Sequence, residues 1–308
     1  MIAQFEDLCL WMYVMVDELW PLVARRYQRP GPAPACSDSE LVTMVLVGEC
    51  RGWDEETDLV EHWQGYRHLF PVIPERSRFK RRRRALAPAI NDLRRVVLRH
   101  LDLAQDRQCA IDSLPVPALQ FHLVPRSSAV GHWTEHGAAF GKVTTKKQTI
   151  FGYTLQLLVT LNGVILDFLP APANVNDLEA GAELLAKHRD LLVLGDKGYR
   201  SAPVAAELLA EAGITLLTVP RMTQRVQRAP AHAALHTRWR QLVETVNGQL
   251  AQRFGIEENK AHSVDGLRAR RYSKLTAHTF AVFLNRCLGS PDPSASRASP
   301  SRSSTRAY

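Results

Sequence analysis

The chain lacks the sequence features of exported and membrane proteins. Its five cysteines include no Cys-x-x-Cys pair, their number is odd, and several lie in apolar runs, where a reduced thiol acts as a small core residue. The first residues contain no basic segment of the kind that begins a signal peptide, and no apolar run is long enough to cross a bilayer. We therefore expect a reducing, cytoplasmic setting and no membrane partner.

Several motifs of common enzyme classes are absent as well. The sequence contains no Gly-rich phosphate-binding loop and no Gly-x-Ser-x-Gly turn, which argues against nucleotide hydrolases and serine esterases. Its histidines are not expected to form a zinc site. What the chain does have is an excess of cations, with a formal net charge of +8 over 308 residues, and this favours a polyanionic partner, most often nucleic acid.

The cations are densest between residues 76 and 84, in the run Arg-Ser-Arg-Phe-Lys-Arg-Arg-Arg-Arg. Such a run is often only a solvated face, but five consecutive cations with few acidic neighbours repel one another unless a polyanion neutralises them. Contact with DNA phosphates is therefore the favoured interpretation. The residues of this run that we expect to contact DNA are Arg78, Lys80, Arg81, Arg82, Arg83 and Arg84.

The first third of the chain has the pattern of helices. Apolar residues at helical spacing predict an amphipathic helix from Phe5 to Trp20. The segment from Ser37 to Glu40 has the pattern of a capping box and begins a further helix, which Gly52 can end. At the other end of the chain, residues 290–308 are too poor in large apolar side chains to fold, so we expect a disordered tail.

The middle of the chain alternates between strand and helix patterns. The expected order is a strand at 109–111, a hairpin of strands at 151–159 and 164–168 joined by Asn162-Gly163, a helix at 174–185, a strand at 191–194, a helix at 202–212, a strand at 214–219 and a helix around Glu244. Pro115 and Pro117 are expected to stop the ladder of the first strand. This order predicts an α/β fold with a ribonuclease H-like mixed sheet at 106–289, the catalytic domain, after a small all-α basic domain at 1–105 for DNA binding or oligomerisation.

Three acidic residues stand out by their positions. Asp112 and Asp196 each follow an apolar strand, and Glu244 lies in a stretch with helical spacing. Carboxylates held on strands and helices provide the oxygen ligands that a hard divalent cation needs in phosphoryl transfer. Each residue also has a plainer interpretation: Asp112 as a turn residue, Asp196 as a helix N-terminal residue, and Glu244 as half of an exposed pair with Arg240.

Other charged residues are expected to support these three. Asp167 and Asp177 are candidates for contacts behind the metal ligands rather than for ligands. Lys197 and Arg200 can meet phosphate oxygens beside Asp196, and Arg240 can point with Glu244 into the same site. Further contacts to the DNA backbone are expected from Lys142, Lys146 and Lys147, and from Arg268, Arg270, Arg271 and Lys274.

Five segments of the chain resemble insertion-sequence transposases of the DDE class, and the chain looks most like the nine-eighty-two family of these elements. The segments are Ile111-Asp112-Ser113, residues 151–164, Pro172-Ala-Asn-Val-Asn-Asp177, Leu192-Val-Leu-Gly-Asp-Lys-Gly-Tyr-Arg200 and Val243-Glu-Thr-Val-Asn247. The similarity extends from about Ser37 to Gly289. The string that ends at Arg200 is its most specific part.

The resemblance implies cleavage and strand transfer of DNA, two Mg²⁺ or Mn²⁺ ions, and action on double-stranded transposon ends and target DNA by a homodimer or higher oligomer associated with the nucleoid. It places the metal ligands at Asp112, Asp196 and Glu244, with Arg240 in the arginine position of an Arg-x3-Glu signature. Wider relatives carry a tyrosine and a lysine at two further positions, where this chain has Thr237 and Ala251.

Two alternatives stay open. One is a ribonuclease H-like nuclease or resolvase that cuts DNA without joining it. The other is a DNA-binding regulator that has lost catalysis.

Overall fold

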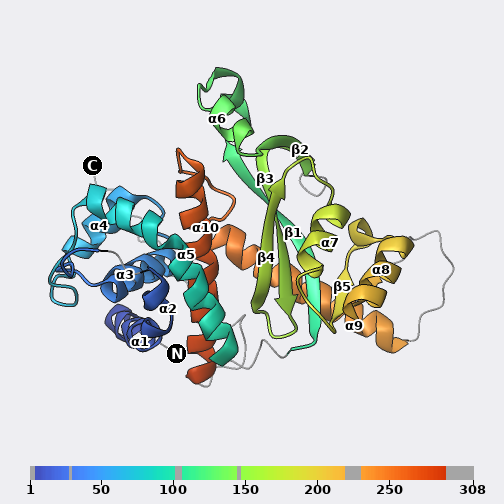
Figure 1. Ribbon diagram of the computed structural model, residues 1–308, viewed down its shortest axis with the longest axis horizontal. Coiled ribbons are helices and arrows are strands. Elements are labelled where there is room, and N and C mark those ends of the chain that lie inside the picture. Colours follow the sequence, from blue (N-terminus) through green and yellow to red (C-terminus); the bar gives the residue numbers. More distant parts are fainter. Residues whose placement is uncertain (1–3, 28–29, 101–105, 144–146, 219–229, 289–308) are drawn as a thin grey trace, which may run out of the picture.

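The first hundred residues fold into helices (Figure 1). The computed structural model describes residues 4–27, 30–100, 106–143, 147–218 and 230–288, with side chains from residue 237 in the last range. The helices are α1 (Phe5–Leu19), α2 (Pro21–Ala24), a 3-10 turn (Arg25–Tyr27), α3 (Asp38–Arg51), α4 (Glu56–Gln64) and α5 (Arg76–His100). The capping box of α3 is confirmed, since Glu40 N donates to Ser37 Oγ at 3.0 Å and Ser37 N donates to Glu40 Oε2 at 2.6 Å. Gly52, with a φ of 73°, ends α3 as expected.

The rest of the chain forms a mixed sheet with helices on both faces. The strands are β1 (Gln108–Leu119), β2 (Ala139–Val143), β3 (Gln148–Thr160), β4 (Ile165–Pro172), β5 (Leu192–Gly195) and β6 (Thr215–Thr218). The helices are α6 (Val130–Glu135), α7 (Asp177–Leu185), α8 (Ala202–Ala212), α9 (Pro230–Gln252) and α10 (Val264–Cys287), with 3-10 turns at Phe121–Arg126 and Lys197–Tyr199.

The strand order confirms the predicted ribonuclease H-like sheet. The described strands follow the order β2-β3-β1-β5-β6, and β4 pairs with the part of β3 that β2 leaves open. β3 runs antiparallel to β1, whereas β5 pairs parallel with both β1 and β6. The mixed sheet comes after an N-terminal helical region, as the sequence predicts.

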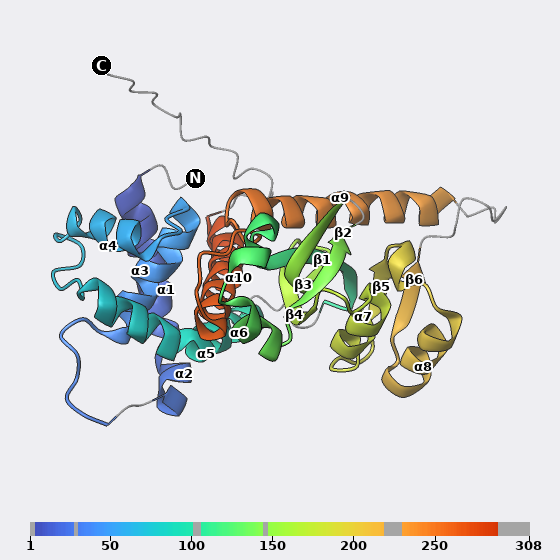
Figure 2. The same ribbon diagram turned by 90° about the horizontal axis from the view of Figure 1, so that it is seen from above.

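Strand alternation assigns the side chains of β1 and β5 to two cores. Ile111 of β1 belongs to the core cluster formed with α7 and α8, whereas Ala110 of β1 and Leu194 of β5 pack with Trp239 of α9. Figure 2 shows α9 running along one side of the sheet and α7 and α8 on the other. Because side chains alternate along a strand, Asp112 lies on the face that α9 covers.

The prediction that Pro115 and Pro117 end the first strand is wrong, since both stay paired with β3. Leu161 N donates to Gln108 O, so the even-numbered residues of β1 direct their backbone groups to β3 and the odd-numbered ones to the opposite edge. β5, the neighbour on that edge, ends at Gly195. The prolines therefore face an edge without a partner strand, and their missing N–H groups cost no ladder hydrogen bond.

The segment between β1 and β3 is more structured than the sequence analysis predicts. It contains a 3-10 turn, α6 and β2, and α6 projects beyond the sheet in Figure 1. Trp133 of α6 is fully buried, and Tyr153 of β3 donates from its hydroxyl to the carbonyl of His136 at 2.9 Å. These two contacts hold α6 against the sheet.

Helix α10 packs on the N-terminal helices α3 and α5. Thr276 Oγ1 donates to the carbonyl of Ile90 at 3.1 Å, and one core cluster includes residues of α1, α3, α5, α10 and the sheet. The expected boundary at residue 105 therefore does not separate two cores. The division into a helical domain at 1–105 and a catalytic domain at 106–289 stays a prediction.

Three expectations concern the surroundings of the protein and its tail. All five cysteines are free. Within the described ranges, no helix is long and apolar enough to span a membrane. Residues 290–308, which are expected to be disordered, lie outside the described residues.

A buried cluster of charges joins α3, α5 and α10. Lys274 Nζ lies 3.1 Å from Glu49 Oε2 and also contacts Asp54 and the carbonyl oxygen of Phe254. Arg83 pairs with the other oxygen of Glu49. Buried ions are tolerated only when they are paired and hydrogen-bonded, and both Lys274 and Arg83 meet this condition. These two cations are therefore part of the core.

The cluster predicts a large loss of stability when its central cation is removed. We expect Lys274→Met to lower the free energy of unfolding by about 3–5 kcal/mol, because Asp54 and one oxygen of Glu49 then lose their cation in the interior. Arg268→Met removes an exposed pair with Asp265 on the same helix and should cost less than about 1 kcal/mol. Urea denaturation of both variants measures the difference, and equal losses would contradict the central place of Lys274 in the core.

Candidate active site at the edge of the sheet

Asp112 and Asp196 lie side by side on two neighbouring strands. In the parallel pair of β1 and β5, Ile111 is opposite Gly195, and each aspartate is the next residue of its chain segment. Neighbouring parallel strands keep their side chains in register, so both aspartates are on the side of α9. β5 ends at this point, whereas β1 continues to Leu119, so the two aspartates lie at the carboxyl end of β5. Open α/β sheets bind ligands at such strand ends.

Helix α9 brings further polar groups to the two aspartates. Asn247 Nδ2 donates to Asp112 Oδ2 at 2.6 Å. Glu244 lies three residues earlier, so its side chain is next to that of Asn247 on the helix surface. Its carboxylate is 61 % exposed and accepts a hydrogen bond from Arg240 Nε at 2.8 Å. The buried Trp239 holds this part of α9 against the sheet.

The surroundings of Asp112 oppose its ionisation. The pKa of Asp112 is raised from 3.8 to about 6, chiefly by burial and also by the negative charges of Asp196 and Asp177. The pKa of Arg240 is raised as well, first by its bond to Glu244 and also by the charges of the aspartate pair. Like charges gathered in this way favour the binding of a cation.

The donor set fits a hard divalent cation. Asp112 and Asp196 offer carboxylate oxygens, and Asn247 Oδ1 is buried without a hydrogen-bond partner. A carbonyl oxygen left unpaired beside a carboxylate is a suitable ligand for Mg²⁺ or Mn²⁺, which take oxygen ligands. Among the described residues, the oxygens of Asp112, Asp196 and Glu244 do not all lie within 4.8 Å of one another.

Residues 104–280 match the family model of the transposase DDE domain, which covers more than half of the chain. The chain belongs to this family. No curated protein and no solved structure gives a match. Membership implies a transposase that binds DNA and performs DDE-type phosphoryl transfer, which in this family typically uses a divalent metal. The matched range contains Asp112, Asp196 and Glu244.

The basic run of this transposase is divided between the surface and the interior. Because an α-helix completes a turn in about 3.6 residues, five consecutive cations cover its whole circumference, including the side that faces the core. Arg78 and Arg81 are exposed. Arg82 donates to Asp38 Oδ1 at 2.6 Å, and Arg83 is only 2 % exposed. The structure therefore places Arg83 in the core and not on a surface that DNA can reach.

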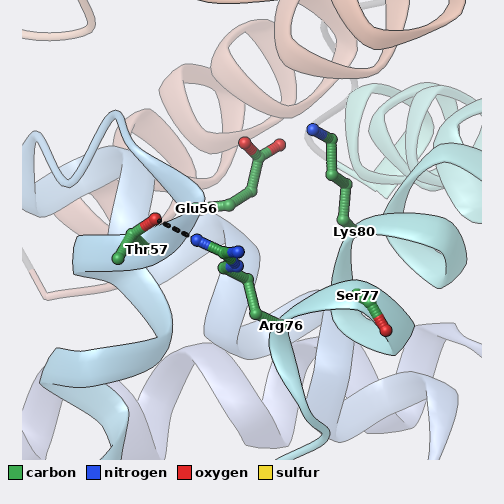
Figure 3. A pocket seen from close by; sticks show the side chains of 5 residues that line it. All are labelled: Glu56, Thr57, Arg76, Ser77 and Lys80. Atoms are coloured by element: carbon green, nitrogen blue, oxygen red, sulfur yellow. Dashed lines mark hydrogen bonds between the residues drawn. The ribbon is translucent and has the colours of Figure 1, made fainter.

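A pocket of about 370 Å³ lies where α4 and α5 begin (Figure 3). Its lining comes from Glu56 and Thr57 of α4 and from Arg76, Ser77 and Lys80 of α5. Arg76 Nη1 donates to Thr57 Oγ1 at 3.0 Å. Lys80 and Arg84 of the basic run are partly buried. The pocket thus lies at the basic end of α5, and neither Asp112, Asp196 nor Glu244 lines it.

The remaining cations expected to contact DNA have mixed outcomes. Those that the structure places at the surface are Lys142, Lys147, Lys197, Arg200 and Arg240. Lys146 lies outside the described residues. In α10, Arg268 is exposed, but Arg270, Arg271 and Lys274 are at most 7 % exposed. The expectation that these three contact DNA is wrong, because they face the core.

One group of possible ligands was not expected from the sequence. His132, Glu135 and His136 of the α6 segment are exposed, and their ligand atoms lie within 4.8 Å of one another. The signal is the spacing of four residues between the histidines, which puts both rings on one side of a helix. Roughly 23 Å of extended strand separates Asp112 from the end of β1, so this group is not part of the carboxylate edge.

The raised pKa of Asp112 predicts how stability depends on pH in buffer containing EDTA. An aspartate with a higher pKa in the folded chain costs no stability below its unfolded pKa of 3.8, and the cost grows as the pH rises to about 6. Asp112→Asn removes this cost and keeps an acceptor for Asn247. We expect the variant to melt a few degrees above the parent at pH 7, with the difference vanishing near pH 4.

Thermal melting at several pH values measures this difference. Asp265→Asn, an exposed site on α10, is the control and should follow the parent at every pH. A melting temperature of the Asp112 variant at or below that of the parent at pH 7 would contradict the raised pKa of Asp112.

Proposed function

We propose that the chain is the transposase of an insertion sequence similar to the nine-eighty-two family, which cleaves DNA at the ends of the element and joins them to target DNA. The observation that carries this proposal is the group of polar side chains at the carboxyl end of β5, beside the middle of β1. There, Asp112 and Asp196 lie on adjacent parallel strands, and Asn247 and Glu244 lie on the helix that crosses them.

Asp112, Asp196 and Glu244 are the proposed ligands of two Mg²⁺ or Mn²⁺ ions. When bound, such ions lower the pKa of an attacking water or 3′-hydroxyl and stabilise the leaving oxygen. Asn247 orients Asp112 through its hydrogen bond and offers its own oxygen. Arg240 balances the charge of Glu244 and can turn its guanidinium to a phosphate at the same edge.

The proposed DNA path follows exposed cations on three parts of the chain. Arg78 and Arg81 lie on α5, Lys142 and Lys147 flank the connection of β2 and β3, and Lys197 and Arg200 follow Asp196. Phosphate contacts of this kind position a duplex and do not read its sequence. We assign the protein to the nucleoid in the cytoplasm, acting as a homodimer or higher oligomer on transposon ends and target.

In the same proposal, the helical region serves in DNA binding or oligomerisation, and the domain with the sheet cleaves and joins the DNA strands. On α9, the positions where wider relatives carry tyrosine and lysine hold an exposed Thr237 and a partly buried Ala251. The proposal assigns no DNA contact to Ala251, because its methyl group can neither donate a hydrogen bond nor carry charge.

Loss of the carboxylate charges should separate binding from cleavage. We expect Asp196→Asn and Glu244→Gln to slow Mg²⁺-dependent cleavage of a labelled transposon-end duplex by at least roughly a hundredfold, because the ligand charge is lost. The affinity for the duplex should remain. Glu211→Gln, an exposed change on α8, is the control and should cleave as the parent does. Unchanged cleavage by the Asp196 variant would contradict the assignment.

The products of the same reaction decide between the rivals. A transposase joins the cleaved end to a second duplex, which gives a longer labelled strand, whereas a nuclease or resolvase of this fold gives only the cleaved strand. A regulator without catalysis binds the duplex and gives neither product when Mg²⁺ is added.

The two exposed arginines of the basic run should dominate its contribution to DNA binding. We expect the double variant Arg78→Ala with Arg81→Ala to bind any DNA duplex more weakly than the parent. The slope of log affinity against log salt concentration should become less steep by about 0.9 for each phosphate that the variant no longer neutralises. The matched control is Arg67→Ala with Arg189→Ala, which removes the same charge from exposed sites outside the run. Equal slopes for the two double variants would show that charge alone, and not this surface, attracts DNA.

A further inference from the structure

A fourth carboxylate reaches the carboxyl edge from the other face of the sheet. Asp177 is the first residue of α7. Its Oδ2 lies 3.6 Å from the position that a Cβ on Gly198 would occupy, and Asp196 Oδ1 lies 2.9 Å from the same position. Because Gly198 carries no side chain, the carboxylates of Asp177 and Asp196 can face the same space.

The other oxygen of Asp177 is held by a buried amide. Gln156 of β3 is 0 % exposed, and its Nε2 donates to Asp177 Oδ1 at 3.0 Å. Its Oε1 accepts from the hydroxyl of Tyr199 at 2.6 Å. A carboxylate only accepts hydrogen bonds, so the amide nitrogen must face Asp177 and the amide oxygen must face Tyr199. Burial raises the pKa of Tyr199 well above 10.0, so its hydroxyl keeps the proton that it donates.

This support exceeds what a helix-capping aspartate needs. Asn176 already caps α7, because its Oδ1 accepts from Glu179 N at 2.8 Å. Burying the amide of Gln156 and the hydroxyl of Tyr199 costs free energy that only complete hydrogen bonding offsets. The bond from Tyr199 orients the amide of Gln156, and that amide fixes one oxygen of Asp177. The second oxygen is thereby directed to the turn that contains Gly198.

We propose that Asp177 is a fourth carboxylate of the metal site, which binds a divalent cation together with Asp196. Gln156 and Tyr199 are positioning residues, since they act on the cation only through Asp177. The inference rests on the proposed function, because it concerns the same site, and it adds a ligand that the three-carboxylate set does not contain.

Titration of the full-length protein with Mn²⁺, followed by calorimetry, tests the proposal without relying on catalysis. Asp177→Asn removes the charge and keeps an acceptor for Gln156, so we expect the fold to persist and Mn²⁺ affinity to fall at least about tenfold. Gln156→Leu should give a smaller loss, because it frees the carboxylate without removing it. The matched control is Glu179→Gln, two residues further along α7 and outside the network, and it should bind Mn²⁺ as the parent does.

A second variant separates this inference from the function on which it rests. If Asp112→Asn weakens Mn²⁺ binding and Asp177→Asn does not, the fourth carboxylate is excluded and the proposed function stands. If neither variant changes Mn²⁺ binding, the metal site itself is misplaced. Loss of affinity in both, with the Glu179 control unchanged, is the expected result.

A measurement on the unaltered protein guards against a variant that does not fold. Fe²⁺ bound in place of Mg²⁺ generates hydroxyl radicals with ascorbate and peroxide, and these cut the backbone close to the ion. We expect cuts at residues 176–178 in addition to those around Asp112 and Asp196, and all should disappear when excess Mg²⁺ is added. Cuts around Asp112 and Asp196 alone would overturn the inference.

Discussion

The parallel pairing of β1 with β5 is the constraint on which the rest of the structure depends. The register that puts Ile111 opposite Gly195 makes Asp112 and Asp196 neighbours, and two adjacent like charges destabilise the strands that hold them. Apolar packing must supply the compensation. It does so on both faces of the sheet, with Ile111 buried against α7 and α8 and Ala110 buried against α9. The repulsion persists in the fold because packing on two sides leaves the strands no room to separate.

Features that are decided by neighbouring residues could be predicted from the sequence. The capping box at Ser37 and the glycine end at Gly52 act within one helical turn, so their patterns identify them. Asp196 could be found in the same way, because it directly follows the apolar strand β5, whereas Asp112 lies inside β1 and not after it. The ribonuclease H-like order followed from the sequence of strand and helix patterns alone.

Features that depend on distant partners could not be predicted. Whether Pro115 interrupts a ladder depends on which edge of β1 has a neighbour, and that is set by where β5 ends. Whether a cation meets solvent or the core depends on its partner: Arg83 pairs with Glu49, 34 residues away, and Lys274 pairs with Asp54, 220 residues away. A run of cations in the sequence shows none of this, so the basic run predicted a wider surface than the fold presents.

These buried pairs also connect the helical region to α9, the helix that contacts Asp112. Lys274 of α10 contacts both Glu49 of α3 and the carbonyl oxygen of Phe254, which lies two residues after the end of α9. In addition, Nε2 of His278 on α10 lies 3.0 Å from Oε1 of Gln249 on α9. One end of α9 is thus fixed to the helical region, while its other described contacts hold it to the sheet.

Glu244 and Asn247 lie on α9 between these two attachments, and Asn247 is the contact of that helix with Asp112. Helix α9 therefore keeps its position through contacts to both the sheet and α10. The helical region is thus part of the scaffold that orients Glu244 and Asn247.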